Sequence, residues 1–277
     1  MLALAWLPPT LANEPVSPSS GIQTVRFRNY SVQQGLPQAS IVAVAQDRAG
    51  FLWFGTQDGL ARFDGYEFAI FRHDPDRPAS ISNNHVLALV ADPAGGLWIG
   101  TQVGGLNYYH ADSGRFDHYR AVVGKAGTLA SDTVTALALD SRQRLWVATT
   151  GGRLQWLARG DKTLHDSGLG PRDALATVRV LLPLADGSLL VGTAQGLWRV
   201  AADGSGMHMW GMGVAAPLDV FALAVAGNGD IWVGSADEGL YQFAANGHLR
   251  RHFVHDAAVA GSLPDNEVRD LHFDRDG

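Results

Sequence analysis

Residues 47–65 read DRAGFLWFGTQDGLARFDG, and about one repeat later residues 92–106 read DPAGGLWIGTQVGGL. The same phrase returns along the chain as DSRQRLWVAT at 140–149, DGSLLVGT at 186–193 and AGNGDIWVGS at 226–235, and it begins again as DRDG at 274–277. A phrase that recurs at a fixed period is the signature of a repeat architecture, so it decides the fold before any other feature of the sequence.

The tryptophan of the phrase gives the length of the repeat. Trp53, Trp98, Trp146 and Trp232 share one position, Leu190 takes it in the fourth copy, and the steps are 45, 48, 44 and 42 residues. This length is typical of a propeller blade and is longer than leucine-rich or ankyrin repeats. The first copy divides into four short apolar runs with turn residues between them, and no longer stretch has apolar residues at helical spacing. The sequence therefore predicts an all-β protein, a β-propeller of four-stranded blades with five complete blades and the start of a sixth.

Each recurring residue has a physical role in such a blade. The first strand begins with a β-branched residue and has a small residue two positions later, as in Val86 and Ala88, which suits a buried inner strand. The aspartate that follows can accept hydrogen bonds from backbone N–H groups in the turn, and a glycine supplies the conformational freedom that the turn needs. We interpret the large and small residues that alternate in the second strand as interblade packing, with a bulky ring over a gap in the neighbouring sheet. These structural residues are Trp53, Gly55, Trp98, Gly100, Trp146, Gly192, Trp232 and Gly234.

Composition excludes several classes of function. The formal net charge is −6 and no run of lysine or arginine occurs, so nucleic acid is not an expected partner. The absence of cysteine excludes disulfides and thiolate metal sites. Residues 1–23 resemble a truncated signal peptide with a linker, although no basic residue precedes the apolar run and a disordered tail is the alternative. Residues 24–277 are then the partial β-propeller domain.

The repeat resembles that of a known family. The pattern at 35–65, repeated at 84–106, 132–149, 218–240 and 262–277, is similar to the two-component regulator propeller repeat. The resemblance implies a periplasmic sensor, with the chain as part of a seven-bladed ring whose last blade residues 25–30 would complete. In this family a β-sandwich, a transmembrane helix and a histidine kinase or diguanylate cyclase output domain follow the propellers.

Ligands of propellers usually bind at one end of the central channel, where loops from all blades meet. The loops before each inner strand and after each Gly-Thr pair share that end, and they are rich in amide and carboxylate groups that suit a small molecule or a glycan. The ligand-binding candidates are Gln57, Asp58, Asn84, His85, Gln102, Asp132, Gln195, Asp237, Glu238, Asp265 and Asn266. Because turns are polar in any protein, a purely structural role for these residues is the alternative.

No catalytic motif, cofactor site or metal site is expected. His248 and His252 would lie on one face of a strand but about 13 Å apart, too far to bind one metal ion. The resulting hypothesis is a ligand-sensing extracytoplasmic propeller of a membrane-bound signalling protein, which could form a dimer. The rivals are a propeller lyase or glycosidase and a protein-interaction scaffold.

Overall fold

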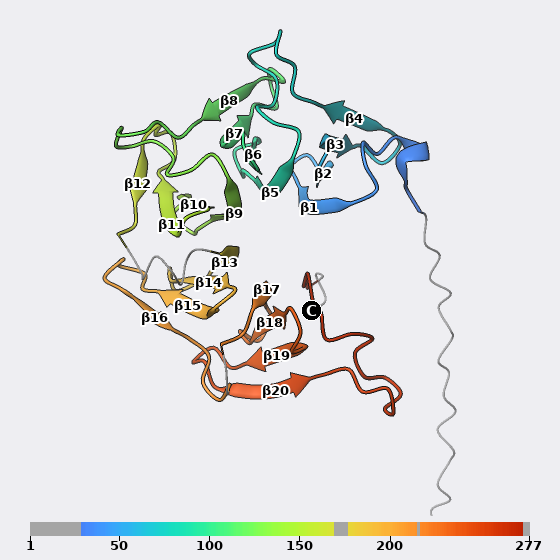
Figure 1. Cartoon of the computed structure of the whole chain (residues 1–277), viewed down its shortest axis with the longest axis vertical. Coiled ribbons are helices and arrows are strands. Elements are labelled where there is room, and N and C mark those ends of the chain that lie inside the picture. The colour runs from blue at the N-terminus through green and yellow to red at the C-terminus, as the bar shows by residue number, and fades with distance from the viewer. Residues whose placement is uncertain (1–28, 169–176, 215–216, 274–277) are drawn as a thin grey trace, which may run out of the picture.

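Five antiparallel sheets of four strands each surround a central opening (Figure 1). The computed structural model describes residues 29–168, 177–214 and 217–273. Within them, helix is confined to one 3₁₀ turn, η1 (Val32–Gln34). The first strand of each sheet lies toward the opening and the fourth lies at the periphery (Figure 1). The prediction of an all-β propeller of four-stranded blades is confirmed for this part of the chain.

The strands follow the chain in sets of four. The first two sheets contain β1 (Ile41–Gln46), β2 (Leu52–Thr56), β3 (Gly59–Phe63) and β4 (Phe68–Phe71), then β5 (Val86–Ala91), β6 (Leu97–Thr101), β7 (Leu106–Tyr109) and β8 (Phe116–Tyr119). The third and fourth contain β9 (Val134–Leu139), β10 (Leu145–Thr149), β11 (Arg153–Leu157) and β12 (Leu164–Asp166), then β13 (Val178–Pro183), β14 (Leu189–Thr193), β15 (Gly196–Val200) and β16 (Met207–Met209). The fifth contains β17 (Val220–Val225), β18 (Ile231–Ser235), β19 (Leu240–Phe243) and β20 (Leu249–Phe253).

The turn between the first two strands forms as the repeat predicts. Asp47 accepts the backbone N–H of Ala49 at 2.9 Å, and Asp92 accepts that of Ala94 at 2.8 Å. Gly50 adopts a φ of 92°, in the region that glycine occupies without steric cost. In the third sheet Gln143 stands at this position with a φ of 59°, so the turn keeps its shape there although the glycine is absent.

Glycine in the second strand lets the next sheet approach closely. A Cβ atom added to Gly55 would lie 2.6 Å from Val86, and one added to Gly100 would lie 2.7 Å from Val134. Gly192 faces Val220 and Gly234 faces Val268 in the same way. The expectation that a tryptophan ring covers this gap is therefore wrong. The glycine lies opposite the start of the next inner strand, so a compact branched side chain fills the space.

The tryptophan position nevertheless packs against the following sheet. Trp53 is 1% exposed, and its ring lies 5.0 Å from that of Tyr109 in β7. Trp146 belongs to a buried cluster with residues of β13 and β14, and Leu190 belongs to one with residues of β18 and β19. Trp98 and Trp232 are only partly buried. The core is thus a series of apolar layers between successive sheets.

The chain ends fall largely outside the described residues. The suggested leader, most of the strand expected at residues 25–30, and the aspartates at 274–277 are among the residues that the structure does not describe. Val268 donates its backbone N–H to Ser235 at 2.9 Å, so the segment after β20 returns to the central opening beside β18. Among the described residues, no helix is both long enough and apolar enough to cross a membrane.

Candidate functional site

The polar loops predicted to share one end of the channel do so. The start of β1 pairs with the end of β2, Ile41 opposite Thr56, and each other sheet shows the same register. The loop before the inner strand and the loop after the second strand therefore lie together. We call this end of the molecule the mouth.

Three of the eleven candidates hold neighbouring sheets together. The side chains of Asn84, Asp132 and Asn266 accept backbone N–H groups from the loop that leaves the preceding outer strand, at 2.7, 2.7 and 2.6 Å. Their backbone carbonyls accept the N–H groups of Gly59, Gly105 and Gly239 in the preceding sheet, at 2.9, 2.8 and 2.9 Å. This repeated brace occupies the polar groups that appeared available for a ligand.

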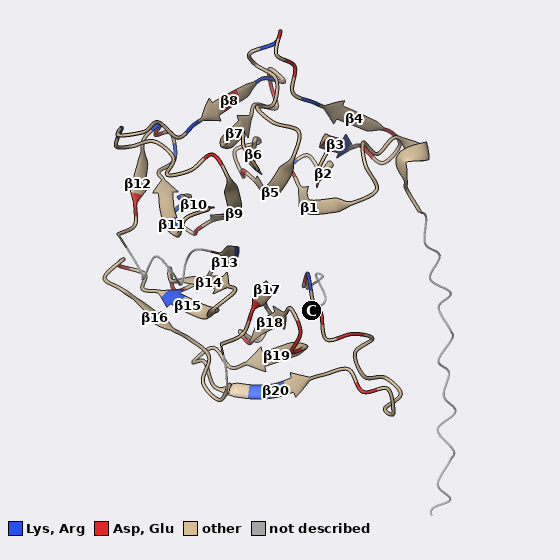
Figure 2. Cartoon of the chain, viewed as in Figure 1, with Lys and Arg blue, Asp and Glu red and all other residues tan. Residues whose placement is uncertain are grey.

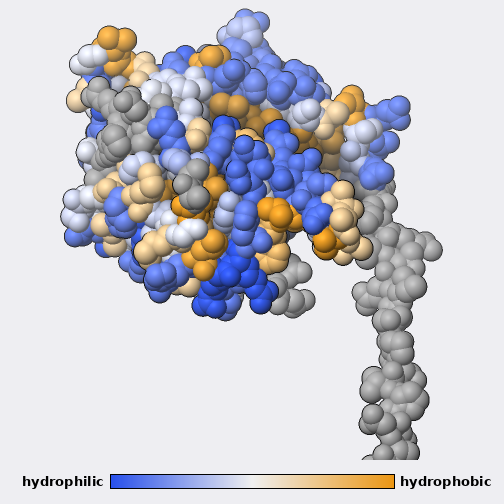
Figure 3. Space-filling model, turned by 60° about the horizontal axis from the view of Figure 1, so that its bottom comes forward, coloured by the Kyte–Doolittle hydropathy of each residue, from blue (hydrophilic) through white to orange (hydrophobic). Residues whose placement is uncertain are grey.

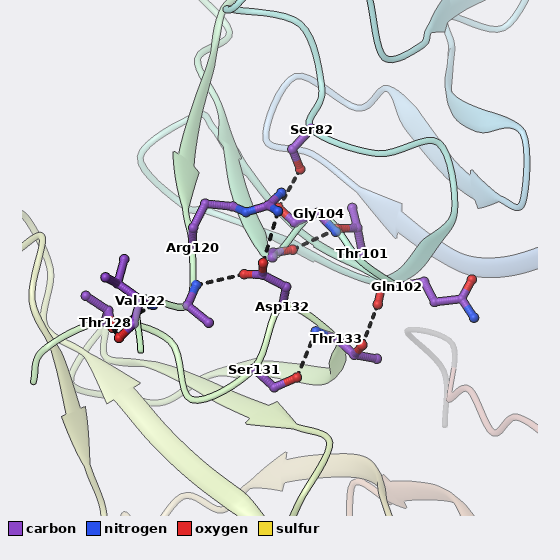
Figure 4. A network of polar contacts seen from close by, with 12 residues as sticks. Ser82, Thr101, Gln102, Gly104, Arg120, Val122, Thr128, Ser131, Asp132 and Thr133 are labelled. Carbon is purple, nitrogen blue, oxygen red and sulfur yellow. Dashed lines mark hydrogen bonds and ion pairs between the residues drawn. The ribbon is translucent and has the colours of Figure 1, made fainter. Parts of the chain in front are cut away.

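Figure 4 shows the brace between the second and third sheets. The carboxylate of Asp132 points into the network, where it accepts from Ala121 and pairs with Arg120 at 3.0 Å. Gln102 enters the same network only through its backbone, because its carbonyl accepts the hydroxyl of Thr133 while its side chain points away from the other groups. The network therefore contains Asp132, whose side chain is structural, and Gln102, whose side-chain amide has no hydrogen-bond partner among the described residues.

The remaining candidates are mostly exposed. Gln57 donates its backbone N–H to the side chain of Gln38 at 3.0 Å, and Asp58 pairs with Arg72 at 2.9 Å. Asp265 accepts the backbone N–H of Glu267, and His85 is half-buried. Among the described residues, no side-chain hydrogen bond or ion pair involves Gln102, Gln195, Asp237 or Glu238. These four side chains are exposed at the mouth.

The inner strands line an open central cavity of about 1090 Å³. Gln57 is the one ligand-binding candidate in its lining, so most of the predicted site lies at its rim rather than inside it. Its wall comes from β1, β5, β9 and β13, together with Phe221 of β17 and Arg269 and Asp270 of the returning segment. Figure 2 shows that β1, β5 and β9 carry no charged residue, whereas β13 carries a basic one near its start.

The charged side of the cavity was missed from the sequence. Arg179 and Arg269 lie over the ring of Phe221, with guanidinium carbons 4.4 and 5.6 Å from its centroid. Arg179 also pairs with Asp219 at 2.8 Å. The sequence does contain a signal for this charged side. Each inner strand begins with a β-branched residue, and the residue that follows it differs from copy to copy. In chain order these residues are Val42, Leu87, Thr135, Arg179, Phe221 and Arg269.

Histidine and carboxylate side chains form no metal site in the described part of the chain. Among residues 29–168, 177–214 and 217–273, no three histidine or carboxylate side chains lie close enough together to hold a metal ion. His252 stacks on Tyr241 with centroids 3.9 Å apart, and its Nε2 atom lies 2.5 Å from the carbonyl oxygen of Glu238. That ring has a structural role.

Comparison with known proteins identifies the repeat. The model of the family described as two component regulator propeller matches residues 35–58, 80–102 and 128–151, which cover the mouth loops and first two strands of the first three sheets. The protein is also 45% identical over 56 residues to histidine kinase P4 of Formosa agariphila, which is 20% of this chain and 4% of that protein.

Solved structures extend the likeness over most of the chain. The extracellular domain of a putative hybrid two-component system from B. thetaiotaomicron is 25% identical with a TM-score of 0.70, over 82% of this chain and 32% of that one. Virginiamycin B lyase from Staphylococcus aureus is 10% identical with a TM-score of 0.62, over 78% of this chain and 71% of that one. The lyase shares the fold, and the present chain spans about a third of the two-component structure.

Proposed function

Because the chain carries two-component regulator propeller repeats, we propose that it is the ligand-sensing part of a membrane-bound bacterial signalling protein. The ligand is a small molecule or a glycan that binds at the mouth. The observation that carries this proposal is the contrast between a repeated brace and exposed, unpaired side chains on the same loops. A frame that is alike in every sheet can carry different loop residues without loss of packing, which is how binding loops are usually presented.

The cavity below the mouth supports the same site. It is large enough for an ordinary small-molecule ligand, and its wall is apolar on one side and carries Arg179 and Arg269 on the other. Guanidinium groups bind carboxylate, sulfate and hydroxyl oxygens through fixed N–H donors. A ligand that enters from the mouth would meet Gln57 and these two arginines, all of which line the cavity.

The proposed location is the extracytoplasmic side of the membrane, because a similar structure is named as an extracellular domain. The similarity to a histidine kinase supports a kinase as the output domain, and a diguanylate cyclase is the alternative. A β-sandwich and a transmembrane segment would connect the propeller to that output. Dimerisation is the expected route by which binding would reach it.

A binding role is favoured over catalysis. The likeness to a lyase is a likeness of fold, and one fold supports many functions. Catalysis by a propeller lyase or glycosidase would need an acid and a base that converge on one substrate position. At the mouth the carboxylates of Asp58 and Asp132 are paired with Arg72 and Arg120. The adjacent Asp237 and Glu238 keep exposed carboxylates, but both lie on a single loop.

Calorimetric titration of the whole chain against a panel of glycans and metabolites tests the proposal. For any compound that binds, Gln57→Ala combined with Gln102→Ala should weaken affinity at least tenfold, while Asp112→Ala on an exposed loop at the opposite end should leave it unchanged. Failure of every compound to bind, or an unchanged affinity in the double variant, would overturn the mouth as the sensing site. Turnover of a bound compound would favour the enzyme instead.

A further inference from the structure

The first and third sheets share a hydrogen bond that the second sheet lacks. The turn aspartate accepts the indole N–H of the repeat tryptophan in those two sheets, Asp47 from Trp53 at 2.8 Å and Asp140 from Trp146 at 3.1 Å. Asp92 instead accepts the hydroxyl of Tyr108 at 2.9 Å. Among the described residues, no partner is found for the indole N–H of Trp98, whose ring is partly exposed. This tryptophan therefore presents a free donor and part of its ring.

A glycine explains the departure. A Cβ atom on Gly96 would lie 2.2 Å from the hydroxyl oxygen of Tyr108, so the ring of Tyr108 reaches Asp92 because residue 96 has no side chain. In the other four sheets the equivalent residue contacts the residue on the third strand opposite the tryptophan position. These pairs are Phe51 with Arg62, Arg144 with Trp156, Ser188 with Arg199, and Asp230 with Gln242.

The result is a cavity of about 300 Å³ between the second and third sheets, at the end opposite the mouth. We call it the aromatic cleft. The rings of Trp98 and Tyr108 lie 4.5 Å apart, and those of Trp98 and Tyr119 lie 5.7 Å apart. The other apolar lining comes from Leu139, Leu145 and Leu157. Its volume is at the lower end of the range for small-molecule sites.

Charges of both signs line the cleft. Asp117 lies 3.0 Å from the Nε2 atom of His110. Arg159, Asp161 and Lys162 belong to the loop between β11 and β12, where Asp161 lies 3.4 Å from the Nε2 atom of His165. Burial raises the pKa of Tyr119, and the negative charges of Asp117 and Asp161 raise it further, so both carboxylates act near that hydroxyl. The positive charge of Arg159 acts on Tyr108 in the opposite sense to burial and Asp92, which raise the pKa of Tyr108. The side chains of Arg159 and Lys162 are exposed, and no ion pair or hydrogen bond of either is found in the described part of the chain. The cleft thus has an apolar floor and a rim that carries both carboxylates and cations.

We propose that the aromatic cleft binds a zwitterionic amino acid with a large apolar or aromatic side chain. The ligand's side chain packs on Trp98 and the leucines. Its carboxylate accepts hydrogen bonds from Arg159 and from the indole N–H of Trp98, and its ammonium group lies between Asp117 and Asp161. A ligand of a single charge would match only one of the two kinds of charge on the rim. The cleft and the mouth lie at opposite ends of the molecule, so this inference stands apart from the proposed sensing site.

The indole N–H signals in a two-dimensional NMR spectrum of the whole chain test the site. Titration with L-phenylalanine should shift the signal of Trp98, assigned from Trp98→Phe, and leave those of Trp53 and Trp146 in place. The two unshifted signals are internal controls, because Asp47 and Asp140 hold those indoles. No shift at millimolar L-phenylalanine or L-leucine would overturn the site.

The charge requirement is tested with probes that share one ring. Phenylethylamine carries the ammonium group alone and 3-phenylpropionate the carboxylate alone, and each should bind at least tenfold more weakly than L-phenylalanine. Equal binding of either probe would overturn the zwitterion, as would a shift with neutral sugars and none with amino acids.

The residue assignment is tested with Arg159→Ala. It should weaken L-phenylalanine at least tenfold and leave phenylethylamine unchanged, because only the carboxylate loses its partner. Arg142→Ala, at an exposed position on the same end of the molecule outside the cleft, should change neither. If both arginine variants bind L-phenylalanine as the wild type does, the proposed orientation is wrong.

Discussion

Two junctions between sheets use the same repeat position in opposite ways. Between the first and second sheets, Trp53 is 1% exposed, stacks on Phe71 at 5.5 Å and contacts Tyr109. Between the second and third, Trp98 holds the same place in the register but lies beside an open cavity. The repeat dictates where a tryptophan stands, and its neighbours on the adjacent strands decide whether it closes a core or lines a cleft.

The largest expected effect separates the two tryptophans. Trp53→Ala should reduce the free energy of unfolding by about 3–5 kcal/mol, since it empties a closed core. Trp98→Ala should cost about 1–2 kcal/mol, since its ring is only partly buried and lies beside a cavity. Urea unfolding curves with equal slopes measure both values. Equal losses would mean that the cleft is closed in solution.

Gly96→Ala should disturb the packing at the junction between the second and third sheets and lower the free energy of unfolding. The new Cβ would collide with Tyr108, and overpacking of this kind costs about 1–3 kcal/mol. The cost should largely disappear in the background of Tyr108→Ala, so a double-mutant cycle should show strong coupling. Gly227→Ala is the matched control, because it lies in the equivalent hairpin of the fifth sheet with nothing within 4 Å of the added atom. Additive effects of the Gly96 and Tyr108 changes would argue against the steric explanation.

Asp140→Asn tests the tryptophan hydrogen bond that the open junction lacks. Burial raises the pKa of Asp140, but bonds from Arg144 and Trp146 outweigh burial and hold it below its ordinary value of 3.8. A lowered folded-state pKa stabilises the protein fully above that ordinary value, and the contribution is lost as the pH falls through the lower one. The variant should therefore lose about 1–3 kcal/mol at pH 7. Its deficit in the free energy of unfolding should shrink below pH 3.8, and a constant deficit across the titration would contradict the assignment.

The smallest effect concerns the mouth ends of the same two junctions. Asp58→Ala combined with Gln102→Ala should change the free energy of unfolding by no more than about 0.5 kcal/mol, because both side chains are exposed. Asp132→Ala removes the brace and should cost about 1.5–3 kcal/mol. Thermal unfolding of the two variants compares them directly. A reversed order would show that the braces, not the exposed residues, are dispensable.

Residues whose contacts lie within a single blade were predictable from the sequence. The turn aspartates, the glycine turn at Gly50 and the inner-strand valines followed from spacing alone, because local hydrogen bonds and backbone strain fix them. The roles of Asn84 and Asp132 were not predictable, because their partners lie in loops 11 residues away along the chain. The cleft at Trp98 was missed for the same reason, since it needs the strand register that places Tyr108 beside Gly96.

The interlock of glycine with the next sheet's valine has a consequence for how such chains change over generations. Each of these sheets has a glycine on its second strand that leaves room for a valine of the next sheet, as Gly55 with Val86 and Gly100 with Val134 show. A duplicated or deleted unit would therefore meet compatible neighbours on both sides. Unequal recombination within the gene could lengthen or shorten the array in whole units. Codon changes at a pair such as Gly96 and Tyr108 would alter one junction between sheets without disturbing the others.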